Sequence, residues 1–131
     1  MGIFDKFFNS EKNEDKEQKK KLPWKDLTTI DQLEAIAEAS KTIPQAIFKH
    51  STRCGISGMV IRNFEASFDV PENQIDLYYL DLLAYRDVSS EIAARFGIFH
   101  ESPQFIVIRN GEAVHHASHS TITPQVLHQY L

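Results

Sequence analysis

Apolar residues recur at helical spacing in two stretches of the first half of the chain. The first stretch begins after Thr29, which can form a capping box with Gln32, and its apolar face consists of Ile30, Leu33, Ile36 and Ala37. The second begins after Cys54, and its apolar face consists of Ile56, Met59, Val60, Phe64 and Phe68. Between the two predicted helices, the apolar run 46–48 suits a buried strand, and one more short strand can form near Trp24.

The second half of the chain alternates strand and helix patterns. Residues 75–80 suit a sheet, and the Phe-Ile-Val-Ile run at 105–108 is the strongest strand pattern in the sequence. Ser89 is placed to cap a short helix that Gly97 ends, with inward residues Ile92, Ala93 and Phe96. Asn110-Gly111 is a hairpin-turn signal, so residues 113–117 should return antiparallel. Thr123-Pro124 predicts the start of a last amphipathic helix.

This order of elements predicts an α/β fold. Strands joined through helices pair in parallel, so we expect a central mixed sheet of four to five strands flanked by helices, with a C-terminal β-hairpin and helix. We expect one domain over residues 23–131 and a flexible charged tail over 1–22, because residues 9–21 are almost entirely polar. The tail begins with an apolar cluster that can contact a membrane surface or a partner, although a frayed or weakly docked end is the simpler interpretation: Ile3, Phe4, Phe7 and Phe8.

Composition narrows the class of protein. The formal net charge is −4 and no large basic face is evident, which disfavours nucleic-acid binding. No apolar run approaches the ~18 residues of a membrane span, and the first eight residues lack the features of a secretory signal, so we expect a cytoplasmic protein. The single cysteine, Cys54, excludes a disulfide-stapled scaffold and an all-cysteine metal site within one chain.

Cys54 stands where a predicted strand, a short polar loop and a helix start meet. The unpaired N–H groups and partial positive charge of a helix N-terminus stabilise a thiolate there. Arg53 adds a positive charge, and Gly55 allows a tight turn beside the sulfur. Ser57 follows one helical turn later, where its hydroxyl can hydrogen-bond the sulfur. The alternative, a small buried hydrophobic cysteine, is opposed by the polar neighbours Thr52, Arg53 and Ser57.

Ser102-Pro103 directly precedes a predicted central strand, where proline is unusual unless it forms a turn or a cis bond. The histidines do not form a metal-binding pattern. His115 and His116 are adjacent, so in a strand they point to opposite faces, and no His-x-x-x-His pair falls on a predicted helix. His50, in the loop before the cysteine, can lower the pKa of the thiol, but a surface position is the simpler expectation. We therefore expect no metal ligands.

The element order and these motifs together resemble the thioredoxin superfamily over residues 24–131. The Cys-Gly-Ile-Ser run at 54–57 occupies the place of the redox Cys-x-x-Cys, with Ser57 where the second cysteine would be. Ser102-Pro103 occupies the place of the cis-proline that faces the active-site cysteine. Residues 105–112 look like the penultimate strand and hairpin of that fold.

Within that superfamily, the run Ile-Phe-Lys-His-Ser-Thr-Arg-Cys-Gly-Ile-Ser at 47–57 is similar to the monothiol bacilliredoxin family. The resemblance implies thiol–disulfide exchange on mixed disulfides between client proteins and bacillithiol. It makes this low-molecular-weight thiol the co-substrate and implies no bound cofactor. The resemblance implies that Cys54 is the catalytic thiol. It also implies thiolate-stabilising or substrate-binding roles for Thr52, Arg53, Gly55, Ile56, Ser57, Ser102 and Pro103.

The chain departs from a dithiol thioredoxin at two positions. Thioredoxins commonly keep a buried acidic residue six positions before the first cysteine, and Phe48 stands there. Ser57 replaces the second cysteine and cannot resolve a mixed disulfide, so the adduct on Cys54 should persist until an outside thiol arrives.

Two other interpretations stay open. Cys-Gly-Ile-Ser is also similar to the Cys-Gly-Phe-Ser of monothiol glutaredoxins, in which Cys54 would be a ligand of an iron–sulfur cluster shared by two subunits. Those proteins usually carry Thr-Val-Pro at the cis-proline and a Gly-Gly pair after the hairpin. This chain has Glu-Ser-Pro at 101–103 and Ser-His-Ser-Thr at 118–121. The third interpretation, a non-catalytic binding module, predicts slow alkylation of Cys54 by iodoacetamide at neutral pH.

Overall fold

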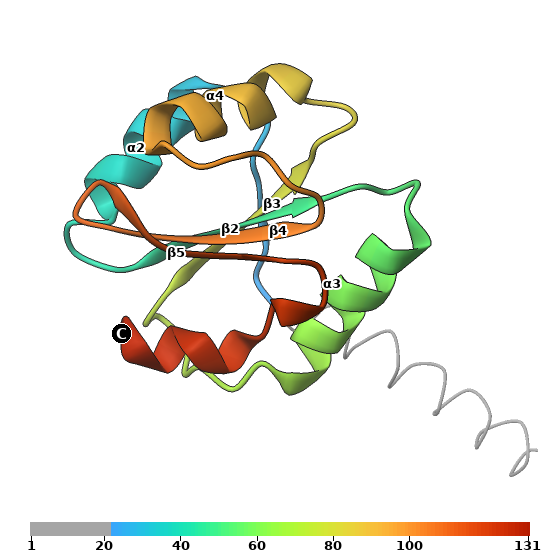
Figure 1. The fold of residues 1–131 in the computed structure, drawn as a ribbon. Helices are drawn as coiled ribbons and strands as arrows, with labels where there is room; N and C mark the ends of the chain where they lie inside the picture. Colours follow the sequence, from blue (N-terminus) through green and yellow to red (C-terminus); the bar gives the residue numbers. More distant parts are fainter. Residues whose placement is uncertain (1–21) are drawn as a thin grey trace, which may run out of the picture.

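The computed structural model describes residues 22–131, which form a five-stranded sheet between two layers of helices (Figure 1). In chain order the elements are β1 (Lys25–Asp26), α2 (Asp31–Ala39), β2 (Gln45–His50), α3 (Gly55–Ser67), β3 (Asp76–Asp81), α4 (Arg86–Phe96), β4 (Gln104–Arg109), β5 (Glu112–Ser118) and the 3-10 helices η1 (His119–Thr121) and η2 (Pro124–Gln129). The strand order is β1-β3-β2-β4-β5. Strands β1, β3 and β2 are parallel, whereas β4 runs antiparallel to β2 and β5 antiparallel to β4. The predicted α/β fold with a mixed sheet is confirmed.

The central strand β2 explains how the two layers share one sheet. All six of its residues are buried, because α3 covers one face of the sheet while α2 and α4 cover the other (Figure 1). Phe48 packs on the α3 side with Phe64 and Phe105, and its ring centroid lies 5.6 Å from that of Phe64. Ile47 points to the other face and packs with the helices α2 and α4, including Ile92. The alternation of a strand thus divides a continuous apolar run between two cores.

Several local predictions are confirmed by particular contacts. Thr29, two residues ahead of α2, and Gln32, in its first turn, exchange the two hydrogen bonds of a capping box, at 3.3 Å and 3.0 Å. Asn110 and Gly111 have φ values of 52° and 79°, the left-handed conformations that a tight hairpin turn requires. Gly97 ends α4 with φ of 66°.

Other predictions about the helices are wrong. Helix α4 begins at Arg86, so Ser89 lies inside it rather than at its cap, where it is buried with its Oγ 3.3 Å from Nδ1 of His100. The last predicted helix, in contrast, is present and starts as expected, with Thr123 as N-cap and Pro124 as its first residue, and it is a 3-10 helix of six residues. Ile56 and Met59 were predicted on the apolar face of α3, but they are 57% and 50% exposed, so both side chains point to solvent.

The predicted tail, including its apolar start, lies almost wholly outside the described residues. Among residues 22–131, no helix is long and apolar enough to cross a membrane.

Candidate functional site

Cys54 is the N-cap residue of α3. Its backbone is extended, with φ of −104° and ψ of 119°, and its carbonyl accepts the Gly58 N–H at 3.1 Å, which is the first hydrogen bond of the helix. Its own N–H donates to the Ser51 carbonyl at 3.2 Å. The half-buried side chain makes no capping hydrogen bond. A thiolate at this position therefore faces first-turn N–H groups that have no acceptor in the helix, together with the positive end of its dipole.

The predicted hydrogen bond between Ser57 and the sulfur is wrong. Ser57 is fully buried, and its Oγ lies 2.7 Å from Nδ1 of His50. The same oxygen accepts the Ser51 N–H at 3.1 Å. Ser57 lies on the buried face of α3 together with Val60 and Phe64, and there it meets His50 at the end of β2. Its hydroxyl supports the loop below Cys54 instead of solvating the sulfur.

His50 is the functional residue that the sequence reasoning placed wrongly. It is the last residue of β2 and is 8% exposed, not a surface loop residue. Its ring centroid lies 5.4 Å from that of Tyr79. Burial, assisted by the positive charge of Arg62, lowers the pKa of His50, and the carboxylate of Asp81 opposes that shift. His50 is therefore neutral at pH 7. Its place two residues after Phe48, on the same face of a strand, was the signal that the interpretation as a polar loop overlooked.

The predicted proline feature is present: the Ser102–Pro103 peptide bond is cis. Gln104 pairs with Lys49 in the antiparallel register of β4 and β2, so Pro103 comes next to His50, at the end of β2 that leads to Cys54. The Pro103 carbonyl accepts the His119 N–H at 3.1 Å. The backbone of Ser102 has no hydrogen-bond partner within the described part of the chain.

The comparisons with known proteins agree with this arrangement of a lone N-cap thiol and a cis-proline. A family model described as monothiol bacilliredoxin BrxC matches residues 25–127. The chain belongs to the monothiol bacilliredoxin family. Membership supports a thiol redox function.

Solved structures agree on the fold. A structure described as a candidate oxidoreductase with a thioredoxin fold is 36% identical, with a TM-score of 0.67, over 79% of this chain and 89% of that one. The thioredoxin of Malassezia sympodialis is 22% identical with a TM-score of 0.62, covering 84% of this chain and 89% of that one. The thioredoxin of Trypanosoma brucei brucei is also 22% identical, with a TM-score of 0.58 and coverage of 81% and 85%. The two thioredoxins establish the fold alone.

Four of the remaining predicted site residues flank Cys54 in the sequence. Thr52, Arg53, Gly55 and Ile56 are all exposed, and Arg53 forms no ion pair with another described residue. The tight turn expected at Gly55 is not required. A Cβ atom added there would meet no heavy atom within 4 Å, and the residue is the first of α3. The backbone at this position therefore tolerates a side chain.

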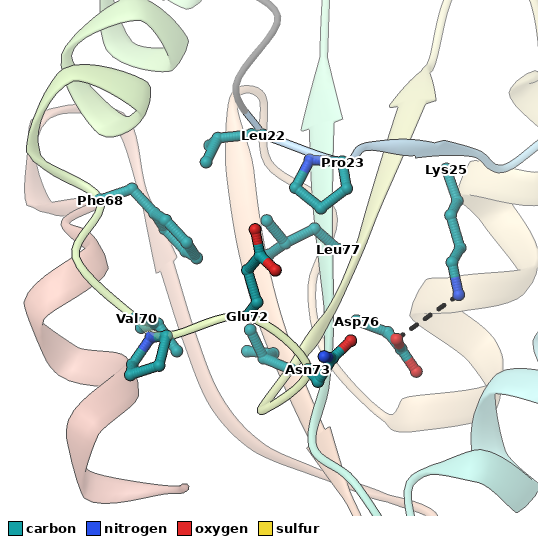
Figure 2. Close-up of a pocket in the computed structure, with 11 residues that line it drawn as sticks. Leu22, Pro23, Lys25, Phe68, Val70, Glu72, Asn73, Asp76 and Leu77 are labelled. Atoms are coloured by element: carbon teal, nitrogen blue, oxygen red, sulfur yellow. Dashed lines mark hydrogen bonds and ion pairs between the residues drawn. The ribbon is translucent and has the colours of Figure 1, made fainter.

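A groove of about 660 Å³ lies at the other end of the same elements, between the end of α3 and the start of β3 (Figure 2). Its apolar wall is formed by Leu22, Pro23, Phe68, Val70 and Leu77. The Lys25–Asp76 ion pair, with 3.4 Å between Nζ and Oδ1, closes one side. Because α3 separates this groove from its own N-cap residue, the groove is not part of the thiol site. Within residues 22–131, no three His, Cys, Asp or Glu side chains are grouped to hold a metal ion.

Proposed function

We propose that the protein removes bacillithiol from mixed disulfides on client proteins through Cys54. The observation that carries the proposal is the lone thiol at the N-cap of α3, at the sheet edge that carries the cis-proline, with a serine in the position of a second thiol. Family membership supports the same chemistry. A thiolate is the species that attacks a disulfide, and the helix N-terminus favours it.

The exchange takes two steps. In the first, the Cys54 thiolate attacks the bacillithiol sulfur of the mixed disulfide, the old S–S bond breaks, and the client thiolate leaves and takes a proton from water. Cys54 then carries bacillithiol in a new disulfide. In the second, the thiolate of another low-molecular-weight thiol attacks that bound bacillithiol sulfur and releases Cys54 as a thiolate. Ser57 has no thiol, so this second step depends on an outside reductant.

Two features of the exposed surface suit an extended client segment. The unpartnered backbone of Ser102 can pair with such a segment, as in strand addition. Ile56 and Met59 are exposed apolar side chains in the first turns of α3, and Phe99, in the loop that leads to the cis-proline, is 92% exposed. Burial of these three side chains against the client would favour docking, because each exposes apolar surface to water in the free protein.

The test offers the protein one client in two forms, bacillithiolated and glutathionylated. Intact mass should show Cys54 gaining the bacillithiol adduct while the client returns to its reduced mass. The Cys54→Ala variant should gain none, and a Ser67→Ala variant, changed at an exposed serine at the far end of α3, should behave as the wild type. Transfer from the glutathionylated client alone would disprove the thiol specificity. A brown, dimeric protein after anaerobic purification would instead favour an iron–sulfur cluster carrier.

A further inference from the structure

The hydrogen bonds around Ser57 fix the direction of its hydroxyl proton. Ser57 is fully buried, and Nδ1 of His50, at 2.7 Å, is the one acceptor that its hydroxyl reaches within residues 22–131. A buried hydroxyl donor needs such an acceptor. Ser57 is therefore the donor, neutral His50 accepts at Nδ1, and Nε2 carries the ring hydrogen. The Ser57 oxygen keeps its lone pairs for the Ser51 N–H at 3.1 Å.

These bonds join His50 to Cys54 by a continuous path. The Ser51 N–H is anchored on the Ser57 oxygen, and the Ser51 carbonyl accepts the Cys54 N–H at 3.2 Å. Ser51 thus holds the cysteine from one side while α3 holds it from the other. Loss of the anchor frees the loop of residues 51–54, and Cys54 then spends less time at the N-cap position, where the helix stabilises its thiolate.

We propose that His50 is a positioning residue for Cys54: it holds the Ser57 hydroxyl in the orientation in which the Ser57 oxygen anchors the Ser51–Cys54 turn. This role rests on the proposed function of Cys54 as the attacking thiol. In this proposal Ser57 has a structural role, which is to support the loop of residues 51–54.

His50 acts here through a hydrogen bond and not through a positive charge. The groups that face it are Asp81 and Tyr79 on β3 and Arg62 on α3. Burial and Arg62 both disfavour its protonation, so the ring is neutral where the exchange would take place. An uncharged side chain with an acceptor in the place of Nδ1 should therefore replace it.

The test is the pH profile of Cys54 alkylation by iodoacetamide in the full chain. Ser57→Ala and His50→Phe should each raise the midpoint by about 0.5 to 1 pH unit, a roughly three- to tenfold loss of thiolate below the midpoint, with the plateau rate unchanged. The double variant should shift no further than Ser57→Ala alone, because the two residues act in series. His50→Asn, whose amide oxygen can take the place of Nδ1, should stay near the wild type. His116→Phe, at an exposed histidine of β5, is the matched control.

Three results would overturn the proposal: a wild-type midpoint in His50→Phe, additive shifts in the double variant, or a shift in His50→Asn equal to that in His50→Phe. Circular dichroism shows whether each variant is folded. If His50→Phe is not folded, the midpoints of Ser57→Ala and His50→Asn still test the positioning role of His50. Alkylation needs no bacillithiol. Unchanged midpoints with normal adduct transfer refute the positioning role alone, whereas absent transfer in the wild type refutes the proposed function alone.

Discussion

Replacing Lys49 with methionine should make the protein more stable at neutral pH. Lys49 lies in the middle of the sheet, between its strand partners Leu80 and Gln104, and its side chain is 0% exposed. It points to the α2 and α4 side, like Ile47 two residues before it. Its Nζ atom is buried and has no hydrogen-bond partner among the described residues. A buried cation without a partner is costly, so this side chain weakens the fold.

The pKa of Lys49 gives the size of the effect. Burial lowers it from 10.5 to about 8. The difference corresponds to about 3 kcal/mol at 1.36 kcal/mol per pH unit. The unfolded chain binds this proton up to pH 10.5 and the folded chain only up to about 8, so the full penalty applies below pH 8. Stability should then rise with pH between about 8 and 10.5 as the penalty disappears.

Urea unfolding at pH 7 and pH 10 measures both parts of this prediction. At pH 7, Lys49→Met should exceed the wild type by about 3 kcal/mol, since methionine fills similar space without a charge. At pH 10 most of that advantage should be gone. Lys41→Met is the matched control at a lysine whose side chain is 61% exposed, and it should change stability by less than about 0.5 kcal/mol. If Lys49→Met is no more stable than the wild type at pH 7, or if its advantage is the same at pH 10, the reasoning is refuted.

Three further predictions concern the thiol site. Ser57→Cys should convert a persistent adduct on Cys54 into an internal disulfide, with release of the low-molecular-weight thiol seen by intact mass; an adduct as long-lived as that of the wild type would contradict this. Gly55→Ala should keep the alkylation midpoint and leave stability unchanged or raise it by up to about 1 kcal/mol, because the site has room for a Cβ; a clear loss in urea unfolding would show otherwise. Because the pKa of His50 is lowered in the fold, the unfolded chain takes up this proton first as the pH falls below 6.5, and the free energy of unfolding should decrease. The decrease should be smaller in His50→Asn. Equal decreases in the two proteins between pH 6.5 and 5 would contradict this prediction.

Features that depend on neighbours in the sequence could be predicted. The turn at Asn110-Gly111 needs two residues that accept positive φ, and the sequence supplies them side by side. The capping box of α2 depends on two residues three apart. Cys54 at a helix start followed from the change in apolar spacing after it. The resemblance in motif order supplied the cis-proline, which local sequence left ambiguous.

Features that depend on register between distant segments could not be predicted. His50 and Ser57 are both polar, and polar residues near a loop are normally exposed. They are buried because β2 continues through His50, and α3 then lays Ser57 against the end of that strand. The same continuation buries Lys49, which follows directly after the apolar run 46–48 that predicted the strand. Ser89 was mistaken for a helix cap because the sequence pattern does not reveal that α4 already begins at Arg86, one turn earlier.

The Ser57 contacts change how the missing second thiol is understood. In the sequence, Ser57 is defined by what it lacks, a sulfur that could resolve a disulfide on Cys54. In the fold, its oxygen already accepts the Ser51 N–H and lies 2.7 Å from Nδ1 of His50, so both partners already occupy the hydroxyl. A cysteine there would make weaker hydrogen bonds to both partners, because a thiol is a poor donor and acceptor. A serine at position 57 therefore holds the loop firmly, whereas a cysteine there could resolve an adduct on Cys54. This chain has the serine. Under the proposed function, we therefore expect the lifetime of the adduct to depend on the supply of the outside thiol rather than on the protein itself.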